Sequence, residues 1–125
     1  MDPGSPVALL GLALTVAFTV IGQVLTKQGM LEMGPSPGRW PDIFVFITRS
    51  LLNVRVILGL LSAVAAALAW LVAVSRSPLS FAYPFMGLSL ILVLLFSSLL
   101  FGEVVPWNRW AGVVIVCLGL FVATR

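Results

Sequence analysis

Four polar side chains recur at every fourth position in an otherwise apolar stretch near the amino terminus. They are Thr15, Thr19, Gln23 and Lys27. Residues four apart lie one above another on a helix, so these side chains form a stripe along one face. An amide and an ammonium are costly inside a membrane unless they face protein, a substrate or water. The spacing therefore predicts a polar track, which we call the polar stripe.

The composition places this stripe in a membrane protein. Hydrophobic residues make up 61% of the 125-residue chain and charged residues only 9%, whereas a soluble domain carries about 25% charged residues. The net charge of +3 comes from scattered basic residues, which argues against a nucleic-acid partner. With no histidine, one cysteine and no Gly-rich nucleotide loop, the chain is expected to hold no metal or cofactor and to be no enzyme.

Apolar stretches of about 20 residues, the length that crosses the hydrocarbon core, define the elements that must position the stripe. We expect an all-α integral membrane protein, with a single domain over residues 1–125 and both termini on one side. A short interfacial or broken helix at about 42–53 precedes the second span, and the Gly- and Pro-rich segment 29–41 is predicted to be a loop. The four transmembrane helices are expected at about residues 6–26, 56–75, 79–101 and 107–124.

Several short motifs in this order carry a family resemblance. Gly22-Gln23 followed by Lys27-Gln28 resembles the end of the first helix in the drug/metabolite transporter superfamily. Within it, this pattern is most similar to the subunits of the 4-amino-4-deoxy-L-arabinose-phosphoundecaprenol flippase. Matching motifs in the second half of the chain lie at residues 77–84, 100–103 and 109–112 and at Gly119.

This resemblance implies a flippase, or a flippase subunit, in the bacterial inner membrane. The implied substrate is a polyprenyl-phosphate-linked sugar, such as aminoarabinose-phosphoundecaprenol, and membrane lipids are further partners. Four helices barely enclose a substrate, so we expect a homodimer or a heterodimer with a related four-helix subunit.

Two alternatives stay open from the sequence. The small multidrug resistance proteins are another four-helix branch, and their fourth-helix glycine pair, which mediates dimerisation, resembles Gly112 and Gly119. Thr19 aligns with the membrane-embedded glutamate of that branch, and a threonine cannot exchange protons, which argues against proton-coupled export of cations or small metabolites. The other alternative is a non-transporting partner subunit of a membrane enzyme.

Lys27, Gln23 and Thr19 are the first candidates for substrate binding. The Lys27 ammonium is a point charge that suits a lipid phosphate, unless it merely snorkels at the end of a span. The Gln23 amide suits sugar hydroxyls or the phosphate, unless it makes an interhelical hydrogen bond. Thr19 extends the track, unless its hydroxyl bonds the backbone of its own helix.

Two aromatic residues are candidate walls of a substrate cavity. Trp70 stands among small residues of the second span and either lines a cavity or packs in the groove that they leave. Tyr83 precedes Pro84, a proline predicted to kink the third span, and either lines a cavity or belongs to the kink alone.

The remaining candidates are charged. Glu103 either attracts an amino sugar or has a structural role, in which it caps the fourth span or pairs with Arg109. Arg109 and Arg55 either assist phosphate binding or act as topology signals. Gly112 and Gly119 lie two helical turns apart and predict a packing face, within the chain or across a dimer.

Overall fold

The computed structural model describes residues 2–125, which fold into five α-helices and no strand. Three of them, α1, α3 and α4, are long and apolar enough to cross a membrane, and α5 is a shorter apolar helix. This confirms the prediction of an all-α, multi-pass membrane protein with a short helix before the second span. The helices are α1 (Pro6–Met33), α2 (Trp40–Ser50), α3 (Val54–Arg76), α4 (Leu79–Phe101) and α5 (Trp107–Ala123).

Local signals set several helix ends. The Ser5 side chain accepts a hydrogen bond from the Ala8 backbone N–H at 3.2 Å, and the Asn53 side chain accepts from the backbone of Arg55 at 2.9 Å. Each satisfies an N–H at a helix start that has no partner within the helix. Helix α4 ends at Gly102, whose φ of 62° is a left-handed conformation that glycine adopts readily.

The predicted loop at residues 29–41 is wrong at both ends, because α1 continues to Met33 and α2 begins at Trp40. Gly29 does not break the helix. A Cβ on this residue would meet the backbone nitrogen of Val56 at 3.2 Å, so the glycine is a point of close approach between α1 and α3. The turn comes only at Gly34, whose φ is 80°.

Helices α1 and α3 pack through small residues, as membrane helices do when backbones approach closely. A Cβ on Gly22 would lie 2.9 Å from the carbonyl oxygen of Gly59. One turn away, the Ser62 hydroxyl donates to the carbonyl oxygen of Phe18 at 2.7 Å. Towards the other end, Gly11 of α1 lies against Ala73 of α3.

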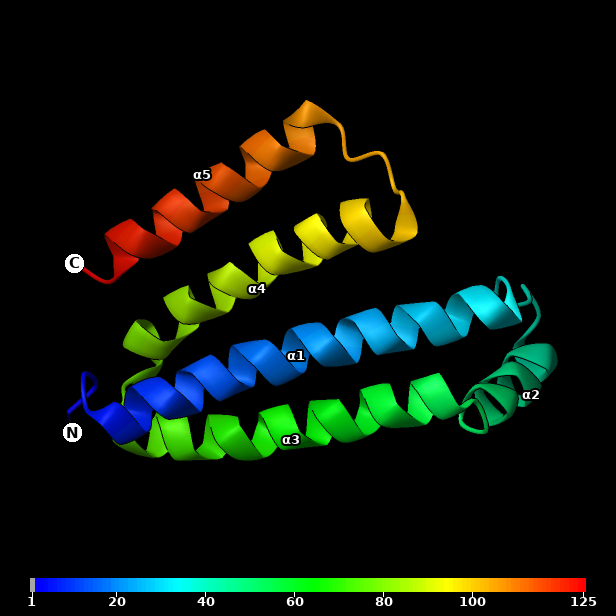
Figure 1. Cartoon of the computed structure of the whole chain (residues 1–125), viewed down its shortest axis with the longest axis horizontal. Helices are drawn as coiled ribbons and strands as arrows, with labels where there is room; N and C mark the ends of the chain where they lie inside the picture. The colour runs from blue at the N-terminus through cyan, green and yellow to red at the C-terminus, as the bar shows by residue number, and fades with distance from the viewer. Residues whose placement is uncertain (1) are drawn as a thin grey trace.

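The remaining helices are arranged around this pair. Figure 1 shows α1 between α3 and α4, with α5 beyond α4 and both termini at the same end of the bundle. Helix α5 packs chiefly against α4 and has no buried residue. A Cβ on Gly112 or Gly119 would meet no atom within 4 Å. No other part of residues 2–125 therefore packs closely against the predicted glycine face.

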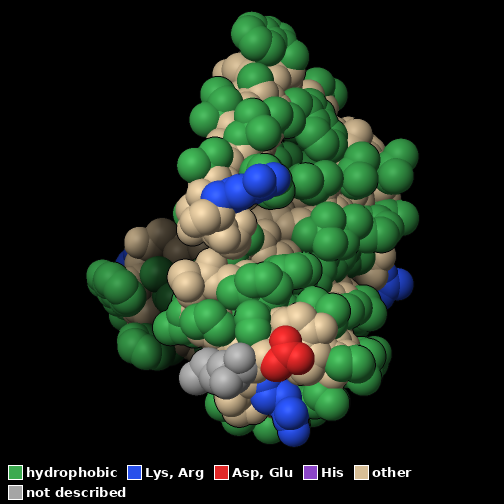
Figure 2. All heavy atoms as spheres, turned by 90° about the vertical axis from the view of Figure 1, so that its left-hand side faces the viewer, with side chains coloured by type: hydrophobic (Ala, Val, Ile, Leu, Met, Phe, Trp, Pro, Cys, Tyr) green, Lys and Arg blue, Asp and Glu red, His purple; other side chains and the backbone are tan. Residues whose placement is uncertain are grey.

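Hydrophobic side chains cover much of the outer surface. They dominate the end of the bundle seen in Figure 2, where only a few charged side chains interrupt them. Exposed examples come from every helix and include Leu10, Phe44, Leu61, Leu99 and Ile115. Such a surface suits lipid rather than water.

We expect Gly59→Ala to lower the stability of the protein by about 1–3 kcal/mol, because the new Cβ meets backbone atoms of α1. Alanine favours a helix more than glycine does, so propensity alone predicts the opposite sign. Thermal unfolding in detergent measures the change. Gly38→Ala is the control, since nothing lies within 4 Å of a Cβ there. Equal stability of both variants would contradict the close packing of α1 on α3.

Candidate functional site

The polar stripe on α1 is only partly engaged by the chain itself. The Thr15 hydroxyl is buried and donates to the carbonyl oxygen of Gly11 at 2.7 Å. The Thr19 hydroxyl and the Gln23 amide make no hydrogen bond to any of residues 2–125. Gln23 and Lys27 are exposed at the surface of the single chain. Thr19 and Gln23 therefore stay available to a ligand, and Lys27 is accessible at the surface.

Three adjoining hollows follow this stripe. The outer hollow, of about 260 Å³, is lined by Gln23, Lys27 and Glu103, among others. The middle hollow, of about 640 Å³, shares Gln23 with the outer one and is also lined by Thr19 and Arg109. The inner hollow, of about 310 Å³, shares Thr19 with the middle one. Because neighbouring hollows share stripe residues, the stripe runs along all three, and we call this line of hollows the track.

Two aromatic rings form the wall of the inner hollow. Trp70 of α3 and Tyr83 of α4 contact each other edge to face, with ring centroids 5.5 Å apart and planes at 82°. Both line the hollow together with Thr15 and Thr19. Tyr83 is 55% exposed, and α4 continues through Pro84 without ending. The structure thus brings both aromatic candidates to the stripe.

Glu103 pairs with Lys27, and neither structural role predicted for it is seen. The Lys27 ammonium lies 3.7 Å from a Glu103 carboxylate oxygen. Helix α5 begins after Pro106 and has no side-chain cap, and the only ion pair that Glu103 makes with residues 2–125 is the one with Lys27. The reason is the left-handed turn at Gly102, after which the Glu103 N–H donates to the carbonyl oxygen of Ser97 at 3.3 Å. This turn folds the chain back towards α1.

Arg55 lies apart from the track. Its guanidinium is 3.0 Å from the carboxylate of Glu32, which also accepts a hydrogen bond from the Asn53 amide at 3.0 Å. None of the three lines any of the three hollows. The pairing joins the last turns of α1 to the first turn of α3, so the structure gives Arg55 a structural partner.

Two serines of α4 line the track and were not predicted. Ser97 lies in the outer hollow and Ser89 in the middle one. They are eight residues apart in an apolar helix, a spacing that keeps them on similar sides of the helix. This eight-residue spacing of polar residues in an apolar helix was the sequence signal that could have identified the two serines. Glu103 is the only carboxylate in the lining of the three hollows.

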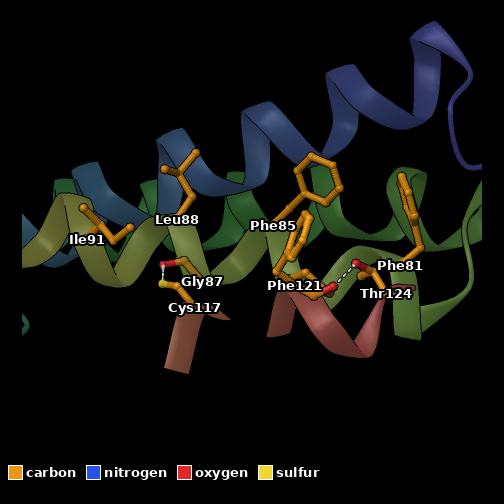
Figure 3. Close-up of a pocket in the computed structure, with 9 residues that line it drawn as sticks. Phe81, Phe85, Gly87, Leu88, Ile91, Cys117, Phe121 and Thr124 are labelled. Carbon is orange, nitrogen blue, oxygen red and sulfur yellow. Dashed lines mark hydrogen bonds between the residues drawn. The ribbon is translucent and has the colours of Figure 1, made fainter. Parts of the chain in front are cut away.

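A separate apolar groove of about 420 Å³ lies between α4 and α5. Figure 3 shows the rings of Phe81, Phe85 and Phe121 around it, with Cys117 close to Gly87. The Cys117 thiol donates to the carbonyl oxygen of Gly87 at 3.8 Å. No charged residue lines this groove, so it does not belong to the polar track. Within residues 2–125, no group of His, Cys, Asp and Glu side chains is arranged to hold a metal ion.

Apolar spanning helices with polar side chains in the hollows between them are what a multi-pass membrane transporter requires. The model of the EamA-like transporter family matches residues 2–125, and the chain belongs to this family. No solved structure matches the chain.

Three curated relatives carry closely similar names. A probable 4-amino-4-deoxy-L-arabinose-phosphoundecaprenol flippase subunit ArnE of Aeromonas salmonicida is 32% identical over 112 residues, which cover 89% of this chain and 91% of the relative. A probable subunit ArnF of the same flippase, from Erwinia tasmaniensis, is 34% identical over 85% of each chain. A probable ArnE of Serratia proteamaculans is 34% identical over 91% of this chain and 92% of its own.

Single cysteines test whether water reaches the track. In a Cys117→Ala background, we expect Gln23→Cys to react with a water-soluble maleimide in native membranes, because thiolate forms only where the thiol is hydrated. Ile21→Cys is the matched control, since Ile21 is exposed on the opposite side of α1 and lines none of the three hollows. Equal labelling of the two positions would contradict a hydrated track.

Proposed function

We propose that the chain is a subunit of a flippase that moves a polyprenyl-phosphate-linked sugar across the bacterial inner membrane. The relatives are named for such a lipid. The observation that carries the proposal is the line of hollows along the polar stripe, with an ammonium at its outer end. A polar head group needs such a track, while its hydrocarbon tail stays in the bilayer.

Each stripe residue binds a different part of the head group, according to its chemistry. Lys27 holds the phosphate, because its ammonium is a compact charge with three donors. Gln23 stands between the outer and middle hollows, where its amide binds phosphate or sugar hydroxyls. Thr19 links the middle and inner hollows, and Trp70 and Tyr83 offer ring faces to the sugar. The head group passes from one set of partners to the next as the track opens to alternate sides.

We further propose that the chain acts in a dimer, with a second copy or with a related four-helix subunit. The track is bounded on one side by α5, which buries none of its own residues. Gly112 and Gly119 lie on this helix with open space beside them. A partner helix that packs on these glycines would shield the middle hollow, which Gly112 lines, from lipid.

We expect Lys27→Ala to slow translocation of 4-amino-4-deoxy-L-arabinose-phosphoundecaprenol in reconstituted vesicles by about tenfold or more, since a charge-assisted contact to phosphate is lost. Arg55→Ala is the control, because it removes a cation of similar exposure that lies outside the track. A Lys27→Ala rate equal to that of the native chain would rule out the role of Lys27.

For the dimer, the paired change Gly112→Leu and Gly119→Leu is expected to abolish most chemical cross-linking between subunits, because the added side chains keep helices apart. Val114→Leu, on the opposite side of α5, is expected to leave cross-linking unchanged. Cross-linked dimers of native abundance in the double variant would place the interface elsewhere.

A further inference from the structure

The ion pair between Lys27 and Glu103, which line the outer hollow, is loose. Lys27 and Glu103 are 3.7 Å apart, and their side chains are 49% and 44% exposed. This distance exceeds that of a charge-assisted hydrogen bond, about 2.7–2.9 Å. Neither side chain forms a hydrogen bond with residues 2–125. An exposed pair of this kind contributes little to stability, so a ligand can separate it at small cost.

The second ion pair of the chain shows what a fixed pair looks like. Arg55 and Glu32 are 3.0 Å apart, and the Asn53 amide donates to the same carboxylate. The exposed fractions, 51% and 49%, are close to those of Lys27 and Glu103. Exposure therefore does not explain the difference between the pairs. The fixed pair joins two helices, whereas the loose pair lines a hollow.

We propose that Glu103 is the residue that recognises the amino group of the head group, and that Lys27 and Glu103 give up their contact with each other when the head group binds. This inference rests on the proposed function and adds the residue that selects for the amine. Lys27 takes the phosphate, and Glu103 takes an amino group on the sugar. The relatives are named for a lipid whose sugar bears its amine on carbon 4. A phosphoester on the anomeric carbon of that ring lies across from this amine, so the two side chains swing apart to admit the ring.

Charge balance makes the pair selective. A head group with both charges leaves no unpaired charge in a hollow that is otherwise lined by Val24, Val93 and Phe101 and by two polar residues. A phosphate on a neutral sugar takes Lys27 but leaves the Glu103 carboxylate unpaired beside an anion. Like charges side by side disfavour the wrong ligand. Glu103 is thus the specificity-determining residue for the amine.

The test compares two lipids that differ only in the charge of the amine. The probes are 4-amino-4-deoxy-L-arabinose-phosphoundecaprenol and its N-acetylated form, and the protein is the purified full-length chain in nanodiscs with any subunit that co-purifies. We expect the native chain to bind the free amine about tenfold more tightly. Glu103→Gln is expected to bring the two affinities within about twofold of each other, while Glu103→Asp keeps the preference. Glu32→Gln, which removes the acid of the fixed pair, is expected to keep the full preference.

The outcomes separate this inference from the function on which it rests. If the native chain binds both lipids equally, or if Glu103→Gln keeps the tenfold preference, the role of Glu103 is overturned while the flippase proposal stands. A Glu103→Gln variant that weakens both lipids by the same factor also overturns it, because Glu103 would then only position Lys27. If the native chain binds neither lipid, the proposed function fails and this inference fails with it.

Discussion

The contact between the backbones of α1 and α3 is the constraint on which the site depends. With Gly22 against Gly59, the rotation of α1 about its axis is fixed. Each residue turns a helix by about 100°, so the neighbour Gln23 points away from α3 and into the hollows that α4 and α5 complete. A side chain at residue 22 would push the helices apart and turn the polar stripe out of register with its walls. The glycines thus orient polar groups that they never touch.

Much of this arrangement follows from local sequence. The four-residue spacing of the stripe and the small face of α3 are periodic signals within one helix, and α1 and α3 carry them. Three of the four predicted spans fall on helices long and apolar enough to cross a membrane, and the fourth falls on the shorter α5. The pairing of Lys27 with Glu103 has no such signal, because it joins the ends of two helices through a glycine turn. The same holds for Arg55, whose partner Glu32 lies in a segment that the glycine and proline content marks as a loop. Both ion pairs depend on how the helices pack against one another, and the residue pattern of a single helix does not encode that packing.

The two ion pairs divide the far end of the bundle into a fixed side and an open side. Arg55, Glu32 and Asn53 hold α1 against α3 with contacts of about 3 Å. On the other face of α1, the loose pair lines the outer hollow with a longer contact. The proposed transport of a charged head group would use this asymmetry, because the close contacts keep α1 and α3 together while the weaker Lys27–Glu103 pair can open.

Helix α5 has a consequence for how such subunits diverge. It buries no residue of its own and rests chiefly on α4, so substitutions along its outer face leave the chain's own folding nearly untouched. In the proposed dimer, selection on that face comes from the partner helix that packs against it. The proposed dimer therefore implies that related chains choose their partners through α5, and that a chimera that exchanges this one helix takes on the partner preference of the donor.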